Sequence, residues 1–172
     1  MRTRAWCWLG LLGLGMSGCA TLSPAEQARQ VSATNKERAR LFTEEVYNQK
    51  RLERIPEYVA ADYVDRSEDA PRELRGPEVV RTQAEAGFAL FPDLRFELLH
   101  ILAEDDWVMV RWRAVGTDAK GPPAADGKPR PVTLQGDSLY RLRDGRFVES
   151  WDLTDRLSPL LQRGYKVVPP DP

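Results

Sequence analysis

The sequence has very few of the residues on which thiol, imidazole and metal chemistry depend. It contains two cysteines and one histidine among 172 residues, and both cysteines, Cys7 and Cys19, lie near the amino terminus. The chain therefore has no His/Cys cluster with metal-ligand spacing, and we expect no metal ion. It also lacks a glycine-rich phosphate loop and a Ser/His/Asp set, so nothing in it favours nucleotide or serine-hydrolase chemistry.

An excess of one charge and a long apolar run are missing as well. The 25 basic and 26 acidic residues give a net charge of −1, which removes any general argument for a nucleic-acid partner. An apolar share of 42% and a charged share of 30% are typical of a soluble globular protein, and the length suits one domain. The apolar run over residues 5–16 is too short to span a bilayer as a mature helix.

The amino terminus is typical of an export signal. Arg2 and Arg4 form a basic start that the apolar run follows. Residues 16–19 (Met-Ser-Gly-Cys) resemble a bacterial lipobox, which implies a lipoprotein signal peptide over residues 1–18 and lipidation at Cys19. The mature protein would then be anchored to a membrane by acyl chains, palmitate among them, in the bacterial cell envelope on the periplasmic side of the outer membrane. A plain secretory signal or an uncleaved anchor is the alternative.

Beyond the signal, the sequence predicts a tether over residues 19–34, with a helix from Ala25 onward as an alternative, a domain over residues 35–157 and a C-terminal tail over residues 158–172. Helical periodicity begins at Thr34 or Asn35, and either residue suits an N-cap. Three helices are expected: one that buries Ala39, Phe42 and Val46, one over residues 52–59, and one from Gly76-Pro77 to Phe91-Pro92.

After residue 93 the apolar period changes from helical spacing to two, which predicts strands over residues 94–104, 107–117, 132–143 and 146–152. The last two flank Asp144-Gly145, a pair that favours a type I′ hairpin turn because both positions require positive φ. Residues 118–131 are rich in glycine, proline and alanine and are expected to form a loop. Helices followed by an antiparallel meander predict an α+β fold, with three N-terminal helices packed on a curved antiparallel sheet.

Several short motifs occur in an order that resembles one family. They are Asn48-Gln49, Tyr63-Val64-Asp65, Phe91-Pro92-Asp93-Leu94, Val110-Arg111-Trp112, Gly136, Tyr140-Arg141, Asp144-Gly145, Glu149, Trp151-Asp152 and Asp155. Between residues 36 and 155 the chain resembles the SnoaL-like polyketide cyclases, also called ester cyclases. The resemblance implies the cone-shaped nuclear transport factor 2-like fold and an enzyme without a cofactor. It also implies that Asp152 acts as general acid and base in an intramolecular aldol ring closure.

An aspartate in an apolar pocket is a suitable base because desolvation raises the carboxyl pKa towards neutrality. The alternative for Asp152 is a structural acid that is hydrogen-bonded at a strand end. Members of the family often carry histidine where this chain has Arg66 and Ser150, and period two places Ser150 on the same face as Asp152. The residues expected around the substrate pocket are Tyr63, Arg66, Phe88, Trp112, Tyr140, Ser150 and Trp151.

Other polar residues have structural interpretations. Asp155 is expected to cap a turn or helix that starts near Arg156, and His100 is expected on a strand at the edge of the sheet. Arg111 and Arg113 share one strand face, where they suit solvent or a dimer interface better than an anionic substrate. A homodimer through the open face of the sheet is expected from the fold.

Two hypotheses for the function follow. The first is a cyclase or isomerase that acts without a cofactor on a hydrophobic, polyketide-like carbonyl compound, with Asp152 as the base. The second is a non-catalytic envelope lipoprotein whose cone binds an apolar small molecule or a protein partner. A buried Asp152 that faces a cavity without an Arg or Lys partner favours catalysis, and an exposed or ion-paired Asp152 favours binding.

Overall fold

The computed structural model describes residues 22–68, 70, 72–121 and 123–168. The predicted signal peptide, Cys19 and the last four residues lie outside the described residues. The helical segments are α1 (Pro24–Phe42), the π-helix η1 (Thr43–Asn48), the 3₁₀ turn η2 (Leu52–Arg54), α2 (Ile55–Tyr58), α3 (Pro77–Leu90) and α4 (Leu157–Gln162). The strands are β1 (Val59–Asp65), β2 (Arg95–Glu104), β3 (Trp107–Thr117), β4 (Pro131–Arg143) and β5 (Arg146–Thr154).

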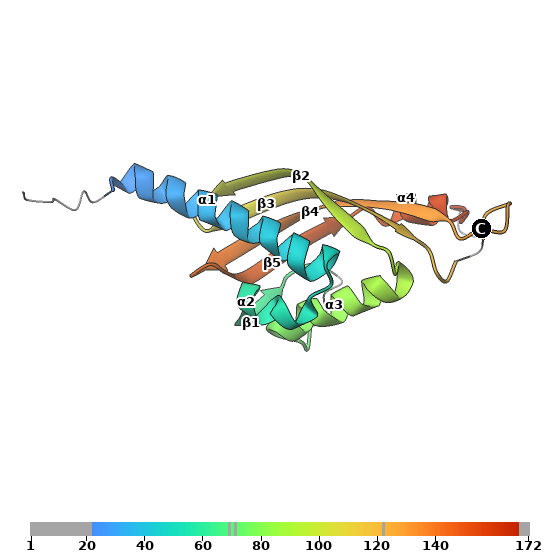
Figure 1. Ribbon diagram of the computed structural model, residues 1–172, viewed down its shortest axis with the longest axis horizontal. Coiled ribbons are helices and arrows are strands. Elements are labelled where there is room, and N and C mark those ends of the chain that lie inside the picture. The colour runs from blue at the N-terminus through green and yellow to red at the C-terminus, as the bar shows by residue number, and fades with distance from the viewer. Residues whose placement is uncertain (1–21, 69, 71, 122, 169–172) are drawn as a thin grey trace, which may run out of the picture.

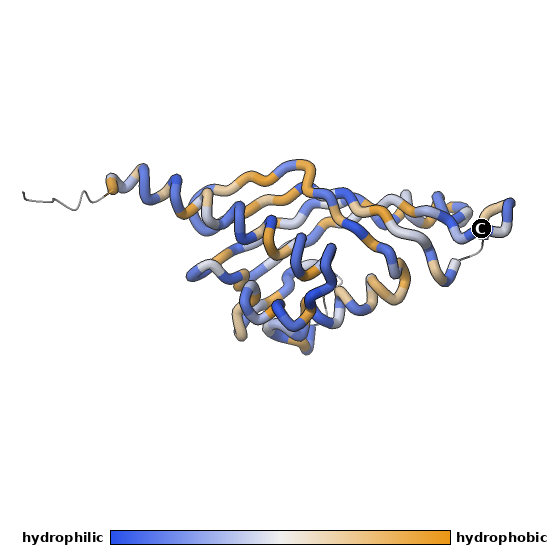
Figure 2. Tube along the Cα trace, in the orientation of Figure 1, coloured by the Kyte–Doolittle hydropathy of each residue, from blue (hydrophilic) through white to orange (hydrophobic). Residues whose placement is uncertain are grey.

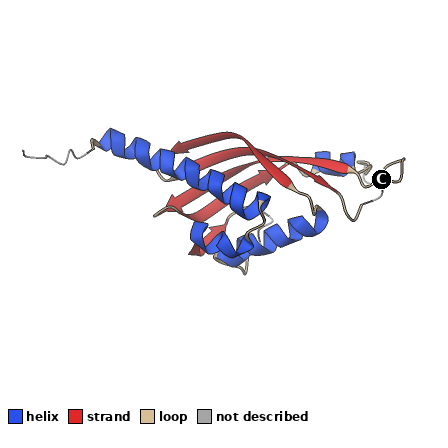
Figure 3. Ribbon diagram, viewed as in Figure 1, coloured by secondary structure: helices blue, strands red, loops and turns tan. Residues whose placement is uncertain are grey.

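The five strands form one bent sheet in the order β1-β5-β4-β3-β2. Neighbours β2 to β5 pair antiparallel as predicted, whereas β1 pairs parallel with β5, so the sheet is antiparallel except at one edge. Helices α1, α2 and α3 lie on one side of this sheet (Figures 1 and 3), which we call its inner face. The predicted α+β architecture is confirmed.

The first helix begins ten residues earlier than the sequence analysis placed it, so most of the predicted tether is helical. Ser23 and Glu26 form a capping box: the Ser23 hydroxyl accepts from the Glu26 amide, and the Glu26 carboxylate accepts from the Ser23 amide. Asn35 is not an N-cap, because it lies inside α1, and its side-chain amide donates to the Asp105 carbonyl oxygen at 2.9 Å. The first turns of α1 extend beyond the sheet (Figure 1), and Figure 2 colours them mostly hydrophilic.

The core lies between α1, α2, α3 and the inner face of the sheet. Ala39, Phe42 and Val46 are buried there as predicted, and Phe42 meets the Phe147 ring of β5 at 4.9 Å between centroids. The second predicted helix is shorter than expected, because Val59 already belongs to β1. The third helix begins and ends at the predicted residues, with Pro77 in its first turn.

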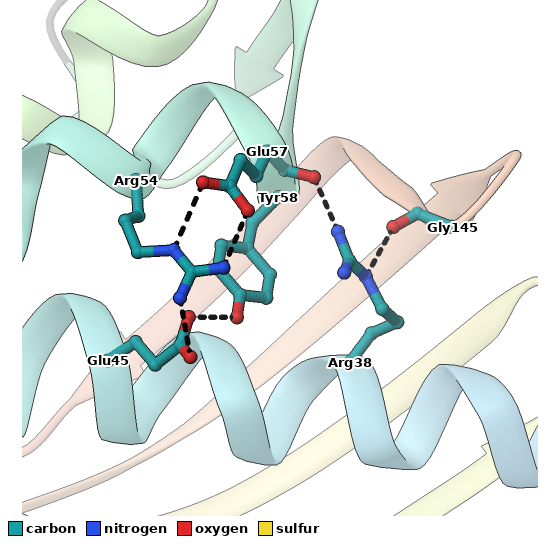
Figure 4. Close-up of polar contacts among 6 residues, drawn as sticks. All are labelled: Arg38, Glu45, Arg54, Glu57, Tyr58 and Gly145. Atoms are coloured by element: carbon teal, nitrogen blue, oxygen red, sulfur yellow. Dashed lines mark hydrogen bonds and ion pairs between the residues drawn. The ribbon is translucent and has the colours of Figure 1, made fainter.

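A polar network joins three elements that are distant in the sequence (Figure 4). Arg38 of α1 donates to the Gly145 carbonyl oxygen at 2.9 Å and to the Glu57 carbonyl oxygen, and its guanidinium lies 4.4 Å from the Tyr58 ring centroid. Gly145 belongs to the predicted hairpin turn, in which φ is 52° at Asp144 and 70° at Gly145. The network therefore ties α1 to α2 and to the β4–β5 turn.

Candidate functional site

A cavity of about 240 Å³ opens between the inner face of the sheet and helices α3 and η1. One part of its wall is apolar or aromatic, with Tyr47, Phe96, Leu98, Val110, Trp112 and Tyr140. The other part is polar, with Asp65, Ser67, Gln83, Ser138, Asp152 and Arg156. The cavity is therefore neither filled by side chains nor uniformly apolar, and hydrogen bonds link five of its polar residues, Gln83, Asp65, Ser67, Asp152 and Ser138.

Asp152 stands in this polar wall near the end of β5. Its Oδ1 atom accepts from the Ser138 hydroxyl, and its Oδ2 atom accepts from the Ser150 hydroxyl at 3.2 Å. Its backbone N–H donates to Ser67 Oγ at 2.8 Å. Among the residues that the structure describes, no lysine or arginine forms an ion pair with Asp152.

Burial is the main influence on the Asp152 carboxyl, and it raises the pKa above the ordinary aspartate value. The nearby Asp65 carboxylate raises the pKa further, whereas the hydrogen bonds from the Ser138 and Ser150 hydroxyls lower it. The net direction is upward, which is the direction that a general base acting near neutral pH requires.

Asp65 is a second buried carboxylate, and the sequence analysis missed its part in the site. Its Oδ1 atom accepts from the Ser67 amide at 2.8 Å and the Ser67 hydroxyl at 2.6 Å, and its Oδ2 atom accepts from the Gln83 amide at 2.6 Å. Period two from Tyr63 would have placed Asp65 on the inner face, but Ser67 and Gln83 follow from no local pattern. Asp65 is fully hydrogen-bonded and holds the loop after β1 against α3.

Two chains of hydrogen bonds lead away from Asp152. Through Ser138 it is linked to Trp112, whose indole N–H donates to Ser138 Oγ at 3.0 Å. Through Ser150 it is linked to Tyr63, whose hydroxyl lies 2.6 Å from Ser150 Oγ. Burial is the largest cause that raises the pKa of Tyr63 and of Tyr140 well above the usual tyrosine value, so both stay neutral.

Four of the seven predicted pocket residues are at the site. Tyr63, Trp112 and Tyr140 line the cavity, and Ser150 is fully buried behind the wall, where it contacts Asp152 as the shared strand face predicted.

The other three were placed wrongly. The Arg66 guanidinium is exposed and binds the Glu149 carboxylate at 2.8 Å, because the side chain leaves the end of β1 away from the cavity. Trp151 alternates with Asp152 along β5, so its ring lies on the outer face against Trp107, 5.5 Å between centroids. Phe88 packs into a separate cluster with Phe91.

The remaining predicted roles are structural. Asp155 Oδ1 accepts from the amides of Leu157 and Ser158 at 3.1 and 3.0 Å, and so caps α4 as expected. His100 is exposed on β2, the edge strand. Arg111 binds Asp137 at 2.8 Å, and Arg113 binds Glu97 at 2.6 Å, both on the outer face.

In the described part of the chain, no group of three or more His, Cys, Asp or Glu side chains is arranged to hold a metal ion. Within the same residues, no helix combines the length and apolar character that crossing a bilayer requires.

Comparison with known proteins gives a consistent result. The model of the SnoaL-like polyketide cyclase family matches residues 37–163. The chain is similar to AclR, a candidate hydroxylase from Streptomyces galilaeus, with 27% identity, a TM-score of 0.65, and coverage of 81% of this chain and 91% of AclR. No protein with a curated description matches the sequence.

Two candidate polyketide cyclases of known structure are also similar. IdmH from Streptomyces antibioticus shares 28% identity with a TM-score of 0.64, and the match covers 76% of this chain and 99% of IdmH. A protein from Acidithiobacillus ferrooxidans shares 25% identity with a TM-score of 0.66, and the match covers 78% of this chain and 96% of that chain. The cone-shaped fold expected from the sequence is confirmed by these neighbours.

Proposed function

The chain belongs to the SnoaL-like polyketide cyclase family, and from that premise we propose that it is a cofactor-independent enzyme whose base, Asp152, removes a proton next to a carbonyl group. The observation that carries the proposal is the setting of Asp152. It is a carboxylate in the wall of a partly apolar cavity, its pKa is raised by burial, and its two oxygens accept only from serine hydroxyls among the described residues. Such a base contributes roughly 10²–10⁴ in rate.

The proposed reaction balances without an added oxidant or reductant. Asp152 takes the proton from the carbon next to one carbonyl, and the resulting enolate carbon attacks a second carbonyl of the same molecule. A carbon–carbon bond forms, and the new alkoxide takes back the proton from the Asp152 carboxyl. The aldol ring closure therefore regenerates the carboxylate.

The size of the cavity bears on the substrate class. A volume of about 240 Å³ exceeds the ~150 Å³ cavity that encloses benzene, but it is below the ~300 Å³ at the lower end of typical ligand pockets. We therefore expect the cavity to enclose one or two rings of a hydrophobic carbonyl compound, with the rest of a larger polyketide-like molecule outside. A binding protein without turnover remains the competing function, and the experiment below separates the two.

The test uses exchange of carbon-bound hydrogen, which reports proton removal whatever the natural product is. The protein is incubated in D₂O with α-tetralone, a two-ring ketone, and deuterium at the carbon next to the carbonyl is measured by mass spectrometry. Exchange should exceed that in buffer, and its rate should rise with pH as Asp152 ionises. Asp152→Asn should abolish the acceleration of deuterium exchange. The ketone should still bind to this variant and raise its melting temperature.

The matched control is Asp62→Asn, the same chemical change at an exposed carboxylate whose partner is Arg143, 2.7 Å away. This variant should exchange the ketone as fast as the wild type. Binding of the ketone without accelerated exchange would refute the enzymatic proposal and leave a ligand carrier. Equal acceleration by Asp152→Asn would refute the assignment of the base.

A further inference from the structure

The two oxygens of the Asp152 carboxylate are held by chemically different chains. On the Oδ1 side, the Trp112 indole N–H can only donate, so Ser138 Oγ accepts that bond and directs its own hydrogen to Oδ1. The direction of this chain is therefore set by Trp112. Oδ1 stays an acceptor in either protonation state of Asp152.

The chain on the Oδ2 side contains hydroxyl groups alone. Ser150 Oγ lies 3.2 Å from Oδ2 and 2.6 Å from the Tyr63 hydroxyl, and a hydroxyl can donate or accept. While Asp152 is ionised, Ser150 donates to Oδ2, so Ser150 must accept from Tyr63. Both hydroxyl hydrogens then point towards the carboxylate.

A proton on Asp152 reverses this second chain. Because Oδ1 already accepts from Ser138, the carboxyl hydrogen resides on Oδ2 and donates to Ser150. Ser150 then donates to the Tyr63 oxygen, and the Tyr63 hydrogen is released from the chain. Tyr63 is among the residues that line the cavity.

We propose that Tyr63 is a further catalytic residue, which donates a hydrogen bond to the substrate oxygen only after Asp152 has taken the proton, and that Ser150 positions it. This inference rests on the proposed function. In the step, the substrate C–H bond breaks and the Asp152 O–H bond forms, while Tyr63 keeps its proton and stabilises the negative oxygen. The donor therefore becomes available at the moment when negative charge develops on the substrate.

The other titratable or charged groups that face this part of the cavity come from separate elements. They are Tyr47 of η1, Asp65 of β1, Tyr140 of β4 and Arg156 after β5. Asp65 is already bonded to Ser67 and Gln83, and among the described residues the hydrogen-bond chain from Asp152 to Tyr63 passes through Ser150. A change in the protonation of Asp152 therefore reaches the Tyr63 hydroxyl through Ser150.

The experiment uses Asp152→Asn as a permanent mimic of the protonated carboxyl. The Asn oxygen would replace Oδ1 as acceptor for Ser138, and its NH₂ group would donate to Ser150 and reverse the chain. Bound α-tetralone should then show a lower carbonyl stretching frequency in the infrared than in the wild type at neutral pH. It should also bind roughly five- to tenfold more tightly, the effect of one additional hydrogen bond.

The double variant Asp152→Asn/Tyr63→Phe should lose both effects, and Asp62→Asn should show neither. A second measurement needs no change at residue 152: acidification of the wild type should lower the carbonyl frequency, and acidification of Tyr63→Phe should not. The inference is overturned if Asp152→Asn leaves the frequency unchanged, if the shift persists without the Tyr63 hydroxyl, or if no ketone binds to Asp152→Asn. The wild type could instead show these shifts in carbonyl frequency but fail to accelerate deuterium exchange into α-tetralone. That result would count against the proposed function alone.

Discussion

At the scale of single residues, the cavity shows how two aspartates acquire different roles from different partners. Asp65 accepts from a backbone N–H, a hydroxyl and an amide, and these bonds hold it in the structure. Asp152 accepts from two hydroxyls and faces the cavity, and burial raises its pKa. The raised pKa of Asp152 suits it to exchange a proton, whereas Asp65 is held by its three hydrogen bonds.

The raised pKa of Asp152 predicts a pH-dependent gain in stability from Asp152→Asn. The folded carboxyl has a higher pKa than the unfolded one, so the folded protein binds more protons between the two pKa values. Wild-type stability therefore falls as pH rises through this window, and the uncharged Asn avoids the loss. Melting curves should show a higher melting temperature for the variant at neutral pH, and the difference should shrink as the pH falls towards about 4, the ordinary aspartate pKa, and change no further below it. A difference that is constant with pH would contradict the burial argument.

Gly136 controls the position of the Trp112 indole. A Cβ atom at Gly136 would lie 2.5 Å from the Leu153 carbonyl oxygen and 2.6 Å from the Trp112 ring. Gly136→Ala should therefore destabilise the protein by about 1–3 kcal/mol, as overpacking does, and displace the ring that donates to Ser138. Urea denaturation would measure the stability, and deuterium exchange into α-tetralone should slow as well.

Gly87 in α3 offers the matched control, because its nearest neighbour would be a Leu94 methyl group at 3.9 Å. Gly87→Ala should be neutral or stabilising by up to about 1 kcal/mol, since alanine favours helix. Equal effects of the two substitutions would show that space beside Trp112 does not matter.

At the scale of elements, the π-helix η1 is the feature that the sequence analysis did not anticipate. It continues α1 without a break and ends at Asn48, whose side chain exchanges two hydrogen bonds with the backbone of Phe96, at 2.7 and 3.1 Å. Tyr47, inside η1, reaches the cavity and meets the Phe96 ring at 5.0 Å. The end of the first helix is therefore attached to β2, and a π-helix is often found next to a functional site.

The network around Arg38 predicts a stability effect that depends on contacts between elements (Figure 4). Arg38→Ala removes two hydrogen bonds and the contact with the Tyr58 ring, so it should cost about 1–2 kcal/mol in the free energy of unfolding. Denaturation in urea would measure it. Arg40→Ala, on the same helix but in an exposed ion pair with Glu37, should leave the midpoint unchanged. Similar losses from both variants would argue against the network.

At the scale of the whole molecule, the outer face of the sheet remains partly apolar. Leu102 and Leu153 are 66% and 75% exposed, and Trp107 and Met109 lie on the same face. The expected homodimer stays a prediction, and this face is where we place it. Light scattering should show a dimer that Leu102→Glu dissociates and Leu90→Glu, on α3, does not. A wild-type protein that is monomeric in solution would contradict the predicted homodimer.

Attachment to the envelope also stays a prediction, because Cys19 lies outside the described residues. If residues 1–18 are a lipoprotein signal, mass spectrometry of the protein expressed in a bacterium should find a mature chain that starts at a lipid-modified Cys19. Cys19→Ala should abolish the modification and move the protein from the detergent phase to the aqueous phase. An unmodified chain that retains residues 1–18 would support the uncleaved anchor instead.

The sequence by itself determined the three N-terminal helices and the four antiparallel strands in their order, the type I′ turn, the Asp155 cap and the shared face of Ser150 and Asp152. Each of these depends on period, turn chemistry or capping, which act over a few neighbouring residues. The tertiary structure decided the parallel pairing of β1 with β5, the outward course of Arg66, the place of Gln83 at the site and the space above Gly136 for Trp112. These features depend on contacts between residues that are far apart in the chain. A local sequence pattern does not predict them, because the packing of all the elements together decides which elements are neighbours.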